Sequence, residues 1–221
     1  MKKPSFPAAA ALLSLVLVLL LSLSSCGEKY EEDEIIAAAA SLVADSGAIN
    51  EIYFGDGLPF AEKGDWEDLY PWYVPPTPPA DGSADLGYYM IKPQSGFLTV
   101  DDIKAATLRV YTKEYSEILF TGAFSGLAVT VGEGGNAEKQ AVSLARYIDA
   151  DGGYLAGRRV TEEEKLPLGR TYDTDGIRVE RQRGNTATVV APSVAPSGEK
   201  EDVRLTLKMT ADGWRLDTPT Y

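Results

Sequence analysis

The chain has 221 residues, of which 44% are hydrophobic and 24% are charged, a balance typical of a globular domain. Its 33 acidic residues outnumber its 21 basic residues, giving a formal net charge of −12. Nucleic acid is therefore a poor partner, because its phosphates are repelled. The chain has no histidine, which excludes Ser-His-Asp and Cys-His catalysis and histidine-ligated zinc.

The first 25 residues have the three parts of a secretory signal peptide. Lys2 and Lys3 form the basic region, an apolar run covers residues 8–23, and the small residues Ser24 and Ser25 close it. The apolar run is short and its downstream flank is acidic, which disfavours a membrane-spanning helix. We expect residues 1–25 to be removed; an uncleaved anchor is the alternative.

The quartet Leu23, Ser24, Ser25, Cys26 resembles the lipobox of bacterial lipoproteins. In those proteins the cysteine thiol is joined to diacylglycerol and becomes the first residue of the mature chain. The resemblance implies that Cys26 is lipidated and that the protein is an extracytoplasmic protein anchored to the cell membrane. A single cysteine in an exported chain agrees, because it has no disulfide partner in that chain. The alternative is a chance cysteine after an ordinary signal.

Acidic residues follow the cysteine directly. Glu28, Glu31, Glu32, Asp33 and Glu34 lie within residues 26–34, which we expect to be a neck before a single domain at 35–221. Anionic lipid headgroups repel such a segment, so the neck is expected to hold the domain away from the membrane. The alternative is that these residues form the negatively charged first turn of a helix.

A helix is predicted from Tyr30 to about Ser46. The window is rich in alanine and lacks proline, and its apolar positions recur at helical spacing. These positions are Ile35, Ile36, Ala39, Ala40, Leu42 and Val43. The helix is expected to end near Gly47, since glycine is the usual residue after a helix.

Residues 55–96 are predicted to form a long loop rich in proline and aromatic residues. Prolines at positions 71, 75, 76, 78 and 79 exclude a helix there and favour extended chain. The loop is expected either to contact a partner or to pack as a strap over the core, and the strap is favoured. Its candidate contact residues are Trp66, Tyr70, Trp72 and Tyr73.

Two short helices are predicted next. Thr99 can cap the first, with Asp102 completing a capping box, and Leu98 can form a hydrophobic staple with Ile103. Thr112 can cap the second helix, over TKEYSEILF. The side chains expected to face inward are Ile103, Thr107, Val110 and Tyr111.

Strands are predicted after residue 125. Seven short stretches alternate and are separated by turn residues: GLAVTV, AVSLARYID, GYLAGRRV, GIRVERQ, TATVVAPSV, DVRLTLKM and GWRLDTP. Asp151-Gly152, Asp175-Gly176 and Asp212-Gly213 suit type I′ hairpin turns. Helices followed by an antiparallel meander predict an α+β fold, with N-terminal helices packed on a curved antiparallel β-sheet.

Two motifs resemble catalytic or nucleotide-binding patterns. Ser197 and Lys200 have SxxK spacing but lie between two predicted strands, where a polar hairpin loop is the better interpretation. Gly132, Gly134 and Ala137 have GxGxxA spacing, but no βαβ pattern follows, which favours a flexible loop.

The acidic groups carry equally weak signals. Asp149 with Asp151, and Asp173 with Asp175, look like the opening of a calcium loop, but glycine and glutamate do not follow at the required places, so hairpin turns are expected. The cluster Asp65, Glu67, Asp68 suits acid-base work only if two carboxyls lie about 5 to 10 Å apart across a bond. Solvated surface is the default. We predict no catalytic residue, cofactor or metal.

Five stretches resemble a group of uncharacterised surface lipoproteins of Gram-positive bacteria. They are EIYFGDGLP, FLTVDDIKAATLRVYTKEYSEILF, ARYIDADGG, GRTYDTDGI and the closing DGWRLDTPTY. The resemblance implies an NTF2-like or cystatin-like domain, in which helices pack into the concave face of a bent antiparallel sheet. The chain is more distantly similar to a secreted inhibitor of peptidoglycan DL-endopeptidases. The resemblance brings no catalytic motif. In the closing stretch, Trp214 and Leu216 are expected to face the core.

The expected function is that of a lipid-anchored, non-enzymatic protein that binds a ligand, an envelope protein or a cell-wall component. One version regulates a cell-wall hydrolase, whose basic cleft an acidic surface could occupy. A carboxylate-dependent hydrolase or isomerase that uses the cavity of the fold is one alternative. A structural envelope module that docks through Trp66, Tyr70, Trp72 and Tyr73 is the other.

Overall fold

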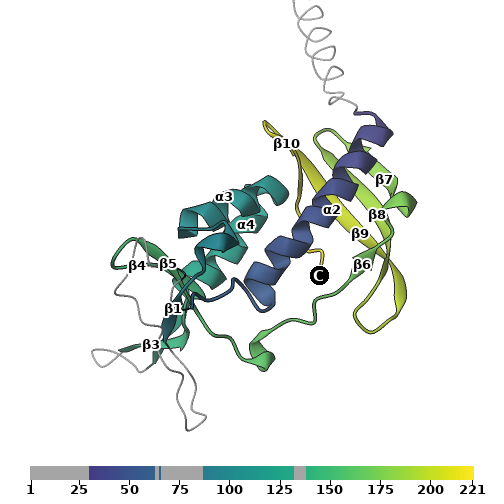
Figure 1. The fold of residues 1–221 in the computed structure, drawn as a ribbon. Helices are drawn as coiled ribbons and strands as arrows, with labels where there is room; N and C mark the ends of the chain where they lie inside the picture. Colours follow the sequence, from purple (N-terminus) through teal and green to yellow (C-terminus); the bar gives the residue numbers. More distant parts are fainter. Residues whose placement is uncertain (1–29, 63–64, 66–86, 132–137) are drawn as a thin grey trace, which may run out of the picture.

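A computed structural model describes residues 30–62, 65, 87–131 and 138–221, with the side chains of residues 127–143 left out. In these residues helices pack on a curled antiparallel sheet, so the predicted α+β class is confirmed (Figure 1). The antiparallel strands are divided among three sheets of five, three and two strands rather than forming one meander.

Helix α2 (Glu32–Phe54) lies across the five-stranded sheet. It buries one face, including Ile35, Ala39 and Leu42. Glu32, Asp33 and Glu34 form its first turn, so the last three residues of the expected neck belong to the helix. By length and composition α2 could cross a membrane, but its apolar face is used in packing against the sheet.

The predicted end of this helix near Gly47 is wrong. Gly47 is exposed inside α2, and the helix continues to Phe54 and is capped by Gly55. Beyond Gly47 the buried face continues with Ile49, Ile52 and Tyr53. Their burial outweighs the roughly 1 kcal/mol that glycine costs inside a helix.

The five-stranded sheet packs against α2. Its strands are β6 (Thr171–Tyr172), β7 (Arg178–Arg183), β8 (Thr186–Val194), β9 (Lys200–Thr210) and β10 (Gly213–Leu216). The order is β10-β9-β8-β6, and β7 also pairs with β8. Side chains at alternate positions of β9, Leu205 and Leu207, are fully buried, and so are Val189 of β8 and Leu216 of β10. Neighbouring positions on the sheet carry exposed ion pairs such as Arg178–Asp202, because successive strand residues face opposite sides.

Helices α3 (Val100–Val110) and α4 (Lys113–Phe120) confirm the predicted capped pair. The Thr99 and Asp102 side chains form a reciprocal capping box, and the Thr112 side chain accepts from the Tyr115 N–H. The predicted inward face of α3 is buried. Leu98 is 51% exposed while Ile103 is fully buried, so the two do not form a buried staple.

A three-stranded sheet lies beyond the end of α2. Its order is β1 (Tyr88–Met90), β5 (Tyr154–Arg158) and β4 (Tyr147–Ala150). β1 belongs to the stretch 55–96, where the sequence predicts only loop. β2 (Leu127–Val131) pairs with β3 (Glu138–Ser143) as a separate hairpin. The single strand predicted over AVSLARYID is therefore two strands, β3 and β4. Between them the Arg146 N–H donates to the Ala123 carbonyl and not to a neighbouring strand.

The prediction of type I′ turns at the Asp-Gly pairs is wrong. Among the described residues only glycines have positive φ, whereas a type I′ turn needs positive φ at both central positions. The pairs Asp151-Gly152 and Asp212-Gly213 do lie where hairpin strands meet. Asp175-Gly176 instead belongs to a short 3₁₀ turn before β7, because the preceding strand β6 pairs with β8 and not with β7.

The closing stretch locks the helices to the sheet. Trp214 and Leu216 face the core as predicted. The chain then continues along the helices, where the Thr112 hydroxyl donates to the Asp217 carboxylate at 2.6 Å and Asn50 Nδ2 donates to Thr220 Oγ1 at 2.9 Å. Residues at the two ends of the described chain are therefore joined in one core.

Candidate functional site

The residues with the sharpest functional predictions lie outside the described part of the chain. They are Cys26, the four contact candidates Trp66, Tyr70, Trp72 and Tyr73, the acidic residues Glu67 and Asp68, and the glycine loop at 132–137. Lipidation and partner contact at these positions therefore stay predictions.

Ser197 and Lys200 lie in a hairpin, as predicted. Ser197 belongs to the connection between β8 and β9, and Lys200, the first residue of β9, pairs with Val194. The Ser197 hydroxyl accepts from the Glu199 N–H at 3.4 Å, and Lys200 is exposed. A polar turn is therefore the observed role of this SxxK spacing.

Two of the acidic candidates stabilise local structure. Asp149 Oδ1 accepts from the Val100 N–H at 2.8 Å and so adds a second cap to α3. Asp65 accepts from the Glu62 N–H at 2.7 Å and lies 3.5 Å from the Lys92 amine. In the described residues no group of three or more acidic or cysteine side chains is arranged to hold a metal ion.

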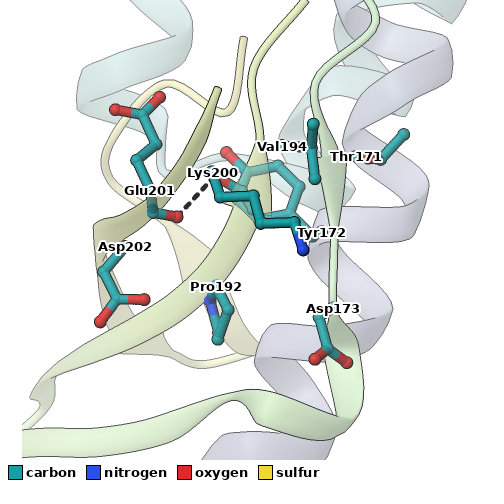
Figure 2. Close-up of a pocket in the computed structure, with 9 residues that line it drawn as sticks. Thr171, Tyr172, Asp173, Pro192, Val194, Lys200, Glu201 and Asp202 are labelled. Carbon is teal, nitrogen blue, oxygen red and sulfur yellow. Dashed lines mark hydrogen bonds between the residues drawn. The ribbon is translucent and has the colours of Figure 1, made fainter. Parts of the chain in front are cut away.

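A shallow hollow of about 630 Å³ lies at the sheet edge, between β6 and the outer ends of β8 and β9 (Figure 2). Asp173, Lys200, Glu201 and Asp202 surround it. Arg170 pairs with Glu201, and Arg178 pairs with Asp202 at 2.8 Å. Because these two carboxylates already have partners, the hollow has the features of an ion-paired sheet edge.

A second hollow, which we call the helix-end cavity, has a volume of about 540 Å³. It lies where the C-terminal end of α2, helix α4, strand β5 and the chain end at Pro219 and Tyr221 meet. Its aromatic lining consists of Tyr53, Phe54, Tyr115 and Tyr221. The Phe54 and Tyr221 ring centroids are 4.4 Å apart, so the rings are in contact.

Arg146 forms one polar wall of the helix-end cavity. It is only 7% exposed, and its Nη1 and Nη2 donate to the carbonyls of Tyr53 (3.2 Å) and Gly55 (2.6 Å). These carbonyls belong to the C-terminal end of α2, which has no basic residue in its own last turn. Arg146 therefore supplies the positive charge that a helix C-terminus favours.

Arg158 and Glu164 form the neighbouring wall. The two Nη atoms of Arg158 donate to the two carboxylate oxygens of Glu164 at 3.1 and 2.5 Å. The Glu164 side chain is 39% exposed, whereas that of Arg158 is 11% exposed. The hydrogen bond from Arg158 lowers the pKa of Glu164, so this carboxylate stays ionised near neutral pH.

The Tyr53 and Tyr115 hydroxyls of the cavity stay protonated. Burial raises the pKa of Tyr53, whose hydroxyl lies 2.9 Å from Thr107 Oγ1. Burial also raises the pKa of Tyr115, with a further contribution from the Tyr221 hydroxyl. These hydroxyls can therefore offer neutral hydrogen bonds but no phenolate base at neutral pH.

The cavity suits binding better than acid-base chemistry. Glu164 is the carboxylate that lines it, and its ion pair with Arg158 removes the tendency to carry a proton that a general acid needs. Sequence analysis missed both arginines, since ARYID and GYLAGRRV read as ordinary strands. The pairing of β4 with β5 brings them together, and the Arg158 N–H donates to the Arg146 carbonyl at 3.0 Å.

Comparison of the chain with protein-family models and with curated proteins finds no match.

Proposed function

We propose that this protein is a lipid-anchored extracytoplasmic binding protein whose ligand or partner occupies the helix-end cavity. The observation that supports this proposal is the lining of the cavity: packed aromatic rings beside arginine side chains that already hold stable hydrogen bonds. Such a surface offers apolar contact and a few fixed polar groups, which is typical of binding sites. A hydrolase or isomerase has less support, because Glu164 is held in its charged form.

Anchoring is tested at Cys26. Cells that express the full chain are grown with labelled palmitate, and the Cys26→Ala variant is compared with the unchanged protein. Label in the membrane fraction is expected only with Cys26 present, because the thiol is the proposed point of attachment. Equal labelling of the variant would contradict lipid anchoring.

Binding is tested in the envelope. The lipidated protein is recovered from membranes, its partners are identified, and each is measured again with purified components, including a panel of cell-wall hydrolases. The Ile118→Glu variant is the cavity test, because Ile118 lines the cavity and is 69% exposed, so the change leaves the core intact. Leu108→Glu on α3, an exposed position that does not line the cavity, is the matched control.

A partner that binds the unchanged protein and the Leu108→Glu control but not Ile118→Glu supports the proposal. Inhibition of a hydrolase with the same dependence on Ile118 identifies the regulatory version. Equal binding by both variants would place the interaction elsewhere on the molecule and contradict a role for the cavity.

A further inference from the structure

The charge of the helix-end cavity is opposite to that of the chain. The charged side chains of its lining are the cations Arg146 and Arg158 and the acidic Glu164, while the whole protein has a net charge of −12. Both arginines are mostly buried. A mostly buried positive wall in an acidic protein favours an anion over a neutral or cationic ligand.

Arg146 retains binding capacity. In the described part of the chain it forms no ion pair with a carboxylate, and its bonds go to the two carbonyls at the end of α2. A guanidinium has five N–H donors, of which these bonds use two. The Asp56 carboxylate, whose pKa Arg146 helps to lower, forms its direct ion pair with Lys165. A ligand carboxylate beside Arg146 would therefore be attracted by its charge.

Arg158 has a partner that can be exchanged. Glu164 lies in the short 3₁₀ turn Glu162–Glu164 and its side chain is 39% exposed, so it can return to water. An incoming carboxylate could take the same bidentate geometry on Arg158. The Thr161 N–H also donates to Oε2 of this carboxylate at 2.8 Å, so this hydrogen bond is exchanged for water together with the ion pair.

Another part of the cavity lining is apolar. Ile118 and Leu119 of α4 face it together with the contacting rings of Phe54 and Tyr221. Ile118 is the most exposed large hydrophobic side chain of the described residues, at 69%. A ligand group that covered it would remove apolar surface from water, and this burial stabilises a complex by about 25 cal/mol per Å².

Resting on the proposed binding function, we propose that the helix-end cavity binds amphipathic carboxylates, with an aromatic or acyl group against Ile118 and Phe54 and the carboxylate on Arg158 beside Arg146. The volume of about 540 Å³ fits a small molecule or the last residue of a peptide. Free acids and peptide C-termini share this chemistry, and the experiment separates them.

Binding to the mature protein is measured by calorimetry with three acids: laurate, N-acetylphenylalanine and an acetylated tripeptide ending in phenylalanine. The carboxamides of the last two are the uncharged controls. N-acetylphenylalanine and the tripeptide, where they bind, are expected to bind at least tenfold tighter than their amides, because a charge-assisted bidentate bond to arginine is lost in the amide. Binding of laurate alone identifies a free acyl acid as the source, and binding of the tripeptide identifies a peptide terminus.

The variants test the assigned residues. Arg158→Gln is expected to weaken acid binding at least tenfold and to leave amide binding unchanged. Glu164→Gln is expected to tighten acid binding, because it removes the carboxylate that competes for Arg158. Ile118→Ser is expected to weaken acid and amide equally, whereas the control Leu108→Ser should change neither.

Binding by none of the three acids, or equal binding of acid and amide, overturns this inference. If Arg158→Gln does not fold, Glu164→Gln decides, and unchanged acid affinity in that variant is contrary to the proposal. The broader function is judged separately: an envelope partner lost only in Ile118→Glu, together with no acid binding, would retain the proposed function and reject this ligand class.

Discussion

Four polar side chains from distant parts of the sequence form one hydrogen-bond network in the core. The Tyr111 hydroxyl donates to Asn50 Oδ1 at 2.8 Å and lies 3.0 Å from Thr220 Oγ1, which donates to Ser46 Oγ at 2.7 Å. Each of the four is at most 5% exposed. Because buried polar groups without partners are costly, this network fixes the position of the chain end against α2.

The Tyr111→Phe variant tests that network. Removal of the hydroxyl leaves Asn50 Oδ1 without its donor, and a loss of about 1 to 3 kcal/mol in the free energy of unfolding is expected. The measurement is urea denaturation of the mature protein. Tyr115→Phe is the control, because its hydroxyl has only a 3.5 Å contact with Tyr221, and it should cost clearly less. Equal losses would mean that the network adds nothing beyond removal of a hydroxyl.

At the scale of elements, helix α2 depends more on its packing than on its local sequence. Ser46 and Asn50, on either side of Gly47 in the sequence, both form hydrogen bonds with Thr220, while Gly47 itself is exposed to solvent. Helix α3 shows the opposite case, since Thr99 and Asp102 define its start within four residues. Local capping thus places α3, whereas tertiary contacts carry α2 past its glycine.

Gly47→Ala is expected to raise the free energy of unfolding by about 0.5 to 1 kcal/mol, because alanine has less freedom to lose in a helix. A Cβ at Gly47 would meet no atom within 4 Å. Thermal and urea denaturation measure the change. Gly96→Ala is the matched control: it has equal space but a φ of 81°, so it should destabilise the protein. A loss of stability in Gly47→Ala would indicate that the helix is interrupted there.

Asp102 makes the stability of the α3 cap depend on pH. Hydrogen bonds from the Leu98 N–H, the Thr99 hydroxyl and the Thr99 N–H lower the pKa of Asp102 below its usual 3.8. Its stabilisation is therefore fully present above pH 3.8 and is lost as the pH falls through the lowered folded value.

Asp102→Asn is accordingly expected to reduce stability at pH 7, and the difference from the unchanged protein should shrink at acid pH below that value. Urea midpoints across the pH range measure this. Asp101→Asn on the same turn is the control, since that side chain is 86% exposed and should matter less. A difference that stays constant down to the lowest pH at which the protein folds would contradict the assigned role of the charge.

At the scale of the whole molecule, α2 separates the two ends of the domain. Its 23 residues span about 35 Å. Tyr30 lies at one end, where its ring contacts Trp214 at a centroid distance of 5.0 Å, and the helix-end cavity lies at the other. Tyr30 is four positions after Cys26 in the sequence, and such a link reaches at most about 14 Å. If Cys26 carries lipid as proposed, we expect the strand ends near Tyr30 to face the membrane and the cavity to open away from it.

Fluorescent labels test this orientation in vesicles that contain a headgroup quencher. Asn185→Cys places a label in the turn after β7, the strand whose Gln182 amide bonds to the backbone of Tyr30. Glu163→Cys places a second label near the other end of α2. The loop that carries residue 163 is held there by the hydrogen bond from the Leu166 N–H to the Phe54 carbonyl. Strong quenching at position 185 and weak quenching at 163 are expected. The reverse order, or equal quenching, would contradict this orientation.

Much of the fold could be predicted because its signals are local. The cap at Thr99, the alternation over TATVVAPSV and the hairpin around Ser197 each depend on neighbouring residues, and each is confirmed. The two-residue strand β6 was missed because its pairing with β8 leaves almost no alternation to detect. The Asp-Gly turns were misassigned because turn type depends on which strands pair, and this is decided by contacts distant in sequence.

The sequence by itself determined most of the helices and strands of the domain, and it showed that the chain has no histidine for catalysis. Only the tertiary structure decided that α2 continues to Phe54, that the chain end returns to Asn50, and that Arg146 and Arg158 line one cavity with Glu164. Capping and alternation act over a few residues, so a sequence displays them directly. A cavity is formed where several elements meet, and its charge depends on which side chains the fold brings together.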